Sequence, residues 1–238
     1  MDRQLFQKVS VHQDAGNALI DSLVETQRPI TIGFLNHHGA NLCHDNDDIK
    51  NNFNELDVLL RDGIGIKIAM SHLKMEPGDN LNGTDFIPTL LKKCKTKPLN
   101  VIAFGTQEPW LSKGLNALGL DPYISCVENG FHQSSYYLEK YKNSLQPKSL
   151  NVVLLAMGMP KQEHLAAQLK TLSNAPVLII CGGAILDFQA GRFQRAPNII
   201  RQFGLEWAYR LIKEPKRLFR RYVIGIPLFF KRMIFISE

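Results

Sequence analysis

Short runs of apolar residues, separated by stretches with helical character, constrain the fold of this chain more than any other feature. Residues 101–104 and 152–155 are apolar at every position instead of alternating with polar residues. Strands of that kind are typical of a parallel sheet covered by helices on both faces. We therefore predict an α/β fold, with a Rossmann-like, mostly parallel sheet flanked by helices and a basic helical C-terminal appendage. The expected strands lie at residues 30–35, 58–60, 99–104, 123–127, 151–157 and 176–181.

The residues that follow these runs indicate where a ligand would bind. In parallel α/β sheets, ligands bind beyond the carboxyl ends of the strands. Every expected strand is followed by polar residues or glycine, so we expect these segments to line one cleft. The segments are residues 36–39, 61–65, 105–107, 128–131, 158–163 and 182–184.

Asp62 is the candidate catalytic residue of that cleft. It stands in Leu60-Arg61-Asp62-Gly63-Ile64-Gly65, where an apolar run changes into a glycine turn. A partly desolvated carboxylate can act as a general base on a sugar hydroxyl, because desolvation raises its pKa toward the range useful for proton transfer. The alternative is an aspartate that only caps the next helix. The spacing leaves both interpretations open.

Residues 158–164 have the composition of a strand-to-helix junction that can bind phosphate. Pro160 suits the first turn of a helix, whose free backbone N–H groups attract anions, and Lys161 and Gln162 would add donors. An ordinary loop with Lys161 and Glu163 in solvent explains the same residues equally well.

Two glycines after the sixth run offer a further place for a phosphate. Gly182 and Gly183 would let backbone amides approach a diphosphate closely. Neither Gly-x-Gly-x-x-Gly nor a Walker loop occurs in the chain, so the sequence supports no dinucleotide fingerprint and no P-loop.

Asp45 and Asp47 have the Asp-x-Asp spacing that can hold a divalent metal against a sugar-nucleotide diphosphate. The pair follows no expected strand and precedes the helical residues 49–56, so an acidic helix start is the favoured interpretation. No motif fixes the geometry of the nearby His37 and His38, and we expect them to face solvent or to form ordinary hydrogen bonds.

Positive charge is concentrated at the C-terminal end. The net charge is +6, and residues 192–238 contain eleven Lys and Arg against three Glu. Such a segment seeks the phosphates of nucleic acid or of an anionic membrane. Residues 222–230 are uncharged but too short to span a bilayer, which takes about 20 residues, so we expect an interfacial anchor there. We divide the chain into a catalytic α/β domain, residues 1–191, and a membrane-docking appendage, residues 192–238.

Cysteine usage and the N-terminus point to the cytoplasm. The four cysteines form no Cys-x-x-Cys spacing, which favours free thiols over a zinc site or a disulfide framework. The first residues include no apolar stretch of signal-peptide length.

Taken in order, the motifs of this sequence are similar to those of the WecG/TagA/CpsF family of glycosyltransferases. Each motif is common by itself, whereas the ordered set extends through most of the chain and is specific. The set comprises Asp62-Gly63-Ile64-Gly65, Asn82-Gly83-Thr84-Asp85, Phe104-Gly105, Asn129-Gly130, Gly158-Met159-Pro160-Lys161-Gln162-Glu163, Gly182-Gly183, Asp187-Phe188, Gly191, Arg195-Ala196-Pro197, Gly204-Leu205-Glu206-Trp207, Tyr209-Arg210-Leu211, Glu214-Pro215 and Arg221-Tyr222.

The resemblance implies an inverting transfer from a UDP-sugar to a saccharide on a polyprenyl diphosphate, in the synthesis of a surface polysaccharide or exopolysaccharide. Asp62 would deprotonate the acceptor hydroxyl, without a metal or another cofactor. The implied partners are the two substrates and the anionic inner face of the cell membrane, not nucleic acid, with a homo-oligomer left open. The residues implied to bind substrate are Asn36, Gly63, Asn82, Thr84, Asp85, Gly105, Asn129, Gly130, Lys161, Gln162, Glu163, Gly182, Gly183, Arg195, Arg210 and Arg221.

One departure from the family pattern leaves the donor sugar open. Members that make the N-acetylmannosamine linkage commonly have a Thr-x-Asn element after the first strand, and this chain has Phe34-Leu35-Asn36 there. Asn36 is kept, but Phe34 replaces the threonine. The exopolysaccharide branch, which resembles a β-1,4-glucosyltransferase acting on a lipid-linked glucose, therefore stays open beside the N-acetylmannosaminyl branch.

Two other functions compete with this hypothesis. One is a metal-dependent glycosyltransferase that uses Asp45 and Asp47 with Mn²⁺ or Mg²⁺. The other is a non-enzymatic nucleic-acid-binding module, suggested by the basic C-terminal segment. The apolar run at residues 222–230 argues against that module, because such a run gains nothing from an aqueous groove.

Overall fold

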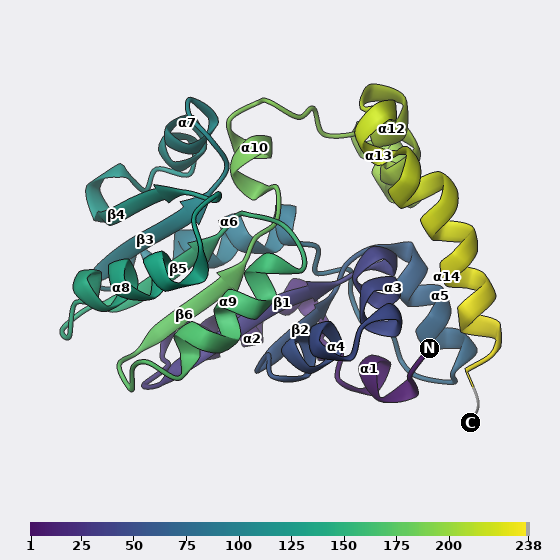
Figure 1. Ribbon diagram of the computed structural model, residues 1–238, viewed down its shortest axis with the longest axis horizontal. Coiled ribbons are helices and arrows are strands. Elements are labelled where there is room, and N and C mark those ends of the chain that lie inside the picture. The colour runs from purple at the N-terminus through teal and green to yellow at the C-terminus, as the bar shows by residue number, and fades with distance from the viewer. Residues whose placement is uncertain (237–238) are drawn as a thin grey trace.

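The computed structural model describes residues 1–236 and contains one six-stranded sheet in the order β2-β1-β6-β5-β3-β4 (Figure 1). All neighbouring strands are parallel, so the predicted Rossmann-like α/β fold is confirmed. Each expected strand forms, although β5 ends two residues earlier than predicted. The strands are β1 (Pro29–Leu35), β2 (Val58–Arg61), β3 (Leu99–Gly105), β4 (Ile124–Asn129), β5 (Leu150–Leu155) and β6 (Val177–Cys181).

The apolar runs form strands because both of their faces are covered. Every residue of β3, β5 and β6 is buried. Val101 pairs with Val152, which in turn pairs with Leu178, so β-branched and leucine side chains from adjacent strands lie side by side on each face of the sheet. Two apolar layers result, one on each face.

Helices cover the two layers unequally. The larger layer packs against α1 (Arg3–Gln7), α3 (His37–Asp45), α4 (Asp47–Asn54), α5 (Ile64–His72), α8 (Ser134–Ser144) and α9 (Lys161–Lys170). The second layer packs against α2 (Asn17–Val24), α6 (Gly83–Cys94), α7 (Trp110–Ala117) and α10 (Ile185–Gln189). Short 3₁₀ turns, η1 (Asp14–Gly16) and η2 (Asp121–Tyr123), join some of these elements.

The sheet opens at its carboxyl edge between β1 and β6. The helix after β1, α3, lies on one face, whereas the helix after β6, α10, lies on the other. Neighbouring strands whose following helices diverge in this way leave a crevice at their ends, where α/β proteins bind ligands. The predicted ligand edge therefore coincides with a topological opening.

The C-terminal segment crosses over this opening and returns along the protein. After α11 (Asn198–Gln202) and α12 (Glu206–Lys213), Pro215 starts α13 (Pro215–Phe219), which confirms the predicted helix break. A π-helical turn, η3 (Arg220–Ile224), connects α13 to α14 (Gly225–Ile234). The helices α12 to α14 form an arm beside α3 and α5, drawn yellow in Figure 1.

Packing of α14 corrects one expectation about residues 222–230. Tyr222 and Phe229 are buried against the protein, and Phe229 and Met233 belong to the same apolar layer as α3 and α5. The uncharged run therefore does not lie as a whole in a membrane interface, although Val223 and Ile224 remain exposed. Among residues 1–236, no helix combines the length and the apolar character that crossing a membrane requires.

Candidate active site

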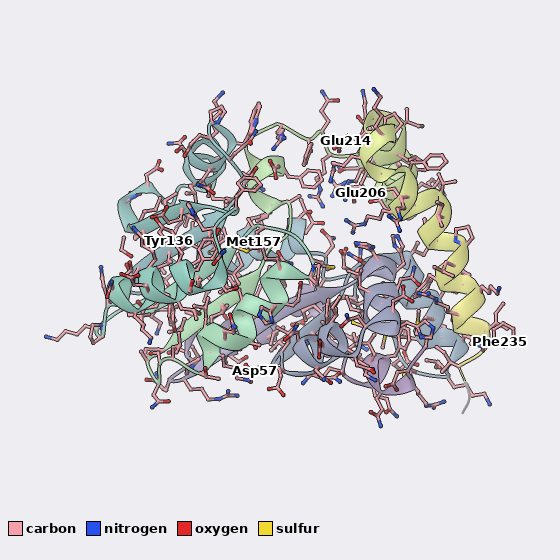
Figure 2. All side chains as sticks on the ribbon, in the orientation of Figure 1. Asp57, Tyr136, Met157, Glu206, Glu214 and Phe235 are labelled. Carbon is pink, nitrogen blue, oxygen red and sulfur yellow. The ribbon has the colours of Figure 1, made fainter. Side chains whose placement is uncertain are left out.

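Two adjoining cavities lie at the carboxyl edge of the sheet. The strand-end cavity, about 530 Å³, lies above the ends of β1, β3, β5 and β6. The appendage cavity, about 380 Å³, lies between the β2–α5 loop and the helices α12 to α14. Met157 lines the first cavity and Glu206 the second, and they lie on opposite sides of the opening between sheet and arm (Figure 2). Both cavities share a wall made of Asn36, Asp62, Thr84, Arg210 and Arg221.

The strand-end cavity unites glycines that are far apart in the sequence. Gly130, after β4, approaches the end of β3 so closely that a Cβ on it would lie 2.6 Å from the Gly105 carbonyl oxygen. Gly183, after β6, has a φ of +59°, a conformation that residues with a side chain rarely adopt. Predicted site residues that line this cavity are Asn36, Asp62, Thr84, Gly105, Gly130, Gln162, Gly182, Gly183, Arg210 and Arg221.

The first turn of α9 fixes the Gly182–Gly183 turn from below. Gln162 is 1% exposed, its Oε1 accepts a hydrogen bond from the Gly183 backbone N–H at 2.9 Å, and its Nε2 donates to Glu163 Oε1 at 2.8 Å. Glu163 is fully buried, and burial raises its pKa to about 7. The two neighbouring side chains are thus interior supports of the turn.

Thr106, Asp187 and Arg192 form a polar network on the opposite wall. The sequence placed Thr106 in the cleft and Asp187 in the family motifs, but it did not show that they bond to one another. Thr106 Oγ1 donates to Asp187 Oδ1 at 2.9 Å, and Arg192 Nη1 donates to the same oxygen at 2.9 Å and to Thr106 Oγ1 at 3.2 Å. All three residues line the strand-end cavity. The position of Thr106 directly after β3 was the available signal, whereas Asp187 lies inside α10.

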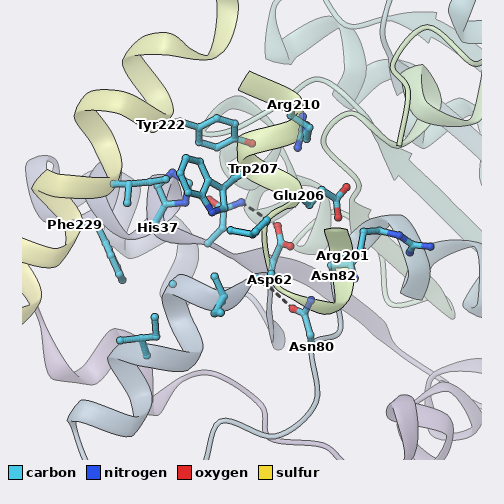
Figure 3. A pocket seen from close by; sticks show the side chains of 18 of the residues that line it. His37, Asp62, Asn80, Asn82, Arg201, Glu206, Trp207, Arg210, Tyr222 and Phe229 are labelled. Atoms are coloured by element: carbon cyan, nitrogen blue, oxygen red, sulfur yellow. Dashed lines mark hydrogen bonds between the residues drawn. The ribbon is translucent and has the colours of Figure 1, made fainter. Parts of the chain in front are cut away.

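Asp62 is oriented by its neighbour across the sheet edge. Asn36 Nδ2 donates to Asp62 Oδ2 at 3.1 Å, and Asn36 Oδ1 accepts from the backbone N–H groups of His38 and Gly39, both at 3.1 Å. Asn36 is the N-cap of α3, so its amide can orient only one way and must present its N–H to the carboxylate. Asp62 points into the appendage cavity (Figure 3).

The appendage cavity combines polar groups with an apolar wall. Trp207 and Tyr222 face it with ring centroids 6.2 Å apart, and Ile226 and Phe230 extend the apolar side. Trp207 and Asp62 line the same cavity (Figure 3). Amphipathic spacing had indicated a helix at these positions, but nothing in the sequence showed that this helix faces Asp62.

Titratable groups in the cavity walls respond to burial and to the arginines. Burial raises the pKa of Glu206, and the Asp62 charge adds to that rise while Arg195 and Arg210 oppose it. Burial, with Arg221 nearby, lowers the pKa of His37 to about 4. His38 has a pKa of about 4 for the same two reasons. His37 Nε2 lies 3.2 Å from the Arg221 carbonyl oxygen, so the hydrogen-bonding alternative of the prediction is confirmed for His37.

Arg210 and Arg221 bring two positive charges to the wall that the two cavities share. Neither guanidinium makes a hydrogen bond or a salt bridge within residues 1–236, and the Nε of each is buried without a partner. Arg210 lies over the Phe188 ring at 5.0 Å, and burial lowers the pKa of Arg221. Guanidinium groups that are desolvated and unpaired at a cavity wall suit an anionic ligand such as a diphosphate.

Gly63 and Asn82 line the appendage cavity, whereas five other predicted site residues lie outside both cavities. Asp85 binds Arg195 through two contacts of 2.5 and 2.6 Å. This pair fastens the segment after α10 to the N-terminal turn of α6. The Asn129 side chain accepts from the Phe131 backbone N–H. The other two are Glu163, described above, and Lys161, whose ammonium donates to the Gly130 and His132 carbonyls at 2.8 and 2.7 Å.

The Asp-x-Asp pair also lies outside both cavities. Asp45 pairs with Arg232 of α14 at 2.5 Å, and Asp47 pairs with Lys50 at 3.0 Å. Asn46 caps α4 and Asp47 lies in its first turn, which confirms the acidic helix start. No three or more His, Cys, Asp or Glu within residues 1–236 cluster in a way that could hold a metal ion.

Fold and cavities together define a Rossmann-like α/β protein with a ligand cleft at the carboxyl ends of its parallel strands, closed by a basic C-terminal arm. The chain belongs to the glycosyl transferase WecG/TagA/CpsF family, whose model matches residues 5–237. It is 25% identical over 173 residues to the N-acetylglucosaminyldiphosphoundecaprenol N-acetyl-beta-D-mannosaminyltransferase of Bacillus spizizenii. The matched region covers 72% of this chain and 65% of the relative's length.

Proposed function

We propose that this glycosyltransferase moves a hexose or an N-acetylhexosamine from a UDP-sugar to a saccharide on a polyprenyl diphosphate, with inversion, in surface or exopolysaccharide synthesis. The observation that carries the proposal is the position of Asp62 in the wall shared by the two cavities. From that wall, a base can reach the hydroxyl of an acceptor bound in the appendage cavity. The same hydroxyl can face the anomeric carbon of a donor bound in the strand-end cavity.

The strand-end cavity suits the UDP-sugar. Gly105, Gly130 and Gly183 form part of its lining, so the backbone there carries no side chain of its own between it and a diphosphate. Arg210 and Arg221 reach the same cavity and supply positive charge. Donor phosphates would thus lie between the strand ends and the arm.

The appendage cavity suits the acceptor. Trp207 and Tyr222 offer aromatic surface to a sugar ring, and Glu206 offers a carboxylate that no protein group within residues 1–236 binds. The apolar side near Ile226 and Phe230 can receive the first part of a polyprenyl chain. The printed name of the Bacillus relative includes a diphosphoundecaprenol acceptor, which supports an acceptor of this class.

The reaction follows from these placements. Asp62 takes the proton of the acceptor hydroxyl while the hydroxyl oxygen attacks the anomeric carbon of the donor. The bond from that carbon to the UDP oxygen breaks on the opposite side. The electron pair leaves with UDP, and Arg210 and Arg221 stabilise the negative charge that develops there. Asn36 keeps the carboxylate turned toward the acceptor.

Phe34 bears on the choice of donor. Its side chain lines the strand-end cavity, at the position where the N-acetylmannosaminyl members of the family commonly have threonine. The Bacillus relative is named as an N-acetylmannosaminyltransferase, so both donor types stay within the proposal. If glucose is the donor, the proposed linkage is β-1,4.

The arm would also bind the protein peripherally to the cytoplasmic face of the cell membrane. Ile212, Phe219 and Ile224 are exposed on it, next to Lys213, Lys216 and Arg220. Exposed apolar side chains among cations are typical of a segment that docks on anionic lipid.

The test is UDP release from purified full-length protein with a panel of UDP-sugars and a polyprenyl-diphosphate-linked acceptor. Release that requires the acceptor supports the proposal, and a thermal-shift series with the same donors ranks them, because a bound ligand raises the melting temperature. Release that is unchanged by omitting the acceptor contradicts it. The same assay with EDTA tests the metal-dependent alternative, which requires turnover to fall.

A further inference from the structure

Glu163 is a buried carboxylate that the proposed reaction leaves without a role. It lies in the first turn of α9, is fully buried, and contacts neither cavity. Its Oε2 has no hydrogen-bond partner among residues 1–236. The Glu163 charge helps to raise the thiol pKa of Cys43 in α3 and of Cys181 at the end of β6, and no cation among residues 1–236 forms a salt bridge with Glu163.

An arrangement of this kind lowers stability. A buried carboxylate without a counter-ion loses its hydration, and one of its oxygens gains no compensating contact. An apolar residue would suit the surrounding layer of Cys43, Cys181 and Leu165 better. Residues that lower the stability of the fold in this way often have a functional role.

A hydrogen bond accepted by the Glu163 side chain leads to the strand-end cavity. Glu163 Oε1 accepts from Gln162 Nε2, which leaves Gln162 Oε1 facing the Gly183 N–H. If the Gln162 amide rotated by half a turn, its NH₂ group would face the Gly183 N–H, and the turn would lose its support. An ionised carboxylate prevents that rotation because it can only accept, so the lock is complete above the Glu163 pKa of about 7.

We infer that Glu163 is a positioning residue that locks the Gln162 amide and thereby holds the Gly182–Gly183 turn in the shape that receives the donor diphosphate. The inference rests on the proposed function of the strand-end cavity. It assigns Glu163 an indirect role in donor binding and none in acceptor binding, since the chain of contacts ends at Gly183.

The experiment measures steady-state kinetics of full-length Glu163→Met and Glu163→Gln against the wild type, varying donor and acceptor separately. Methionine removes the acceptor, so we expect the donor KM to rise about tenfold, the effect of losing one hydrogen bond to a charged group. Acceptor KM and kcat should change little. Glutamine can accept through Oε1 but can also turn its NH₂ group toward Gln162, so it should restore the donor KM only in part.

Leu169→Val is the matched control, because Leu169 is buried on the same helix and makes no contact with either cavity. A donor KM that is unchanged in Glu163→Met overturns the inference. So does an equal change in donor KM for Glu163→Met and Leu169→Val, which would reduce Glu163 to a packing residue. If Glu163→Met does not fold, Glu163→Gln replaces it, and a donor KM equal to that of the wild type then overturns the inference. Gln162→Leu, which removes a side chain from the strand-end cavity itself, serves only as a positive control for weakened donor binding.

UDP binding by the wild type, measured by calorimetry, distinguishes a failure of the proposed function from a failure of the positioning role of Glu163. Wild-type protein that neither binds UDP nor releases it contradicts the proposed function. Wild-type protein that binds UDP, together with Glu163 and Gln162 variants that bind it equally well, overturns only the positioning role.

Discussion

At the scale of single residues, the site depends on two amide side chains that form hydrogen bonds through both their oxygen and their nitrogen. Asn36 caps α3 with its oxygen and orients Asp62 with its nitrogen. Gln162 supports Gly183 with its oxygen and binds Glu163 with its nitrogen. In both cases an amide held by hydrogen bonds at its oxygen and at its nitrogen sets the position of its neighbour in the cleft, Asp62 for Asn36 and Gly183 for Gln162.

Asn36→Ala should therefore damage catalysis and stability together. The loss of an N-cap lowers the free energy of unfolding by about 1 kcal/mol, and the freed Asp62 should lower kcat. Asn46→Ala is the matched control, since Asn46 caps α4 through the Ile49 N–H and contacts neither cavity. We expect similar stability losses in chemical denaturation but a fall in kcat only for Asn36→Ala. Equal kcat values would contradict the orienting role.

Glu163 makes stability depend on pH. Its pKa of about 7 in the folded protein exceeds the ordinary value of 4.5, so the folded state holds the proton more tightly than the unfolded state. Its contribution to stability is complete below pH 4.5 and is lost as pH rises through 7, by up to about 3 kcal/mol. Urea denaturation of wild type and Glu163→Gln from pH 5 to pH 8 should show the wild type losing stability relative to the variant. A constant difference would contradict the burial argument.

At the scale of elements, the strands and the helical character of the arm were predictable, but the packing of the arm was not. Runs such as residues 152–155 are apolar at each position, which only a strand buried on both faces explains well. Phe229 and Met233 form an apolar face that fits lipid or protein equally, and only the folded chain shows that α3 and α5 cover it.

For the candidate site, too, the sequence predicted the residues at the strand ends but not those that packing brings to them. Asp62, the glycines and Gln162 follow strands, so the topology of the sheet predicted their meeting. Glu206 and Trp207 belong to α12 of the arm. They line the cavity that contains Asp62 only because of how α12 packs, which the sequence did not show. Glu163 and Lys161 differ from Gln162 only in which side of the first turn of α9 they occupy, and the sequence pattern did not distinguish those sides.

Arg221 tests the function of the π-helical turn. This wide turn directs Arg221 into both cavities, whereas the preceding Arg220 is exposed and lines neither. Arg221→Met should lower kcat/KM about 100-fold or more with a detergent-solubilised acceptor, as loss of charge stabilisation in the transition state does. Arg220→Met should remain near wild type in the same assay. Equal activities of the two variants would contradict the diphosphate role.

At the scale of the whole molecule, one arm serves the site and would serve the membrane. Its inner face supplies Glu206, Arg210 and Arg221 to the cavities, and its outer face exposes Ile212 and Phe219. Phe235, at the far end of the arm, is also exposed (Figure 2). Lipid binding and catalysis should therefore be separable by substitution on opposite faces.

Combined substitution of Ile212, Phe219 and Ile224 by serine should weaken flotation with vesicles that contain an anionic lipid. Transfer to a short-chain, soluble acceptor should stay close to wild type, because none of the three side chains lines a cavity. Val11→Ser, an exposed apolar residue outside the arm, serves as the control for flotation. Undiminished flotation of the triple variant would place the lipid contact elsewhere, and preferential binding to DNA would contradict membrane docking.

The position of Asp62 between donor and acceptor is the central claim, and Asp62→Asn tests it most directly. Asparagine keeps the size of the side chain but cannot take a proton, so acceptor-dependent UDP release should fall by about 100- to 10,000-fold. UDP binding by calorimetry and the melting temperature should stay close to wild type. Full transfer activity in a folded Asp62→Asn protein that binds UDP would contradict the account.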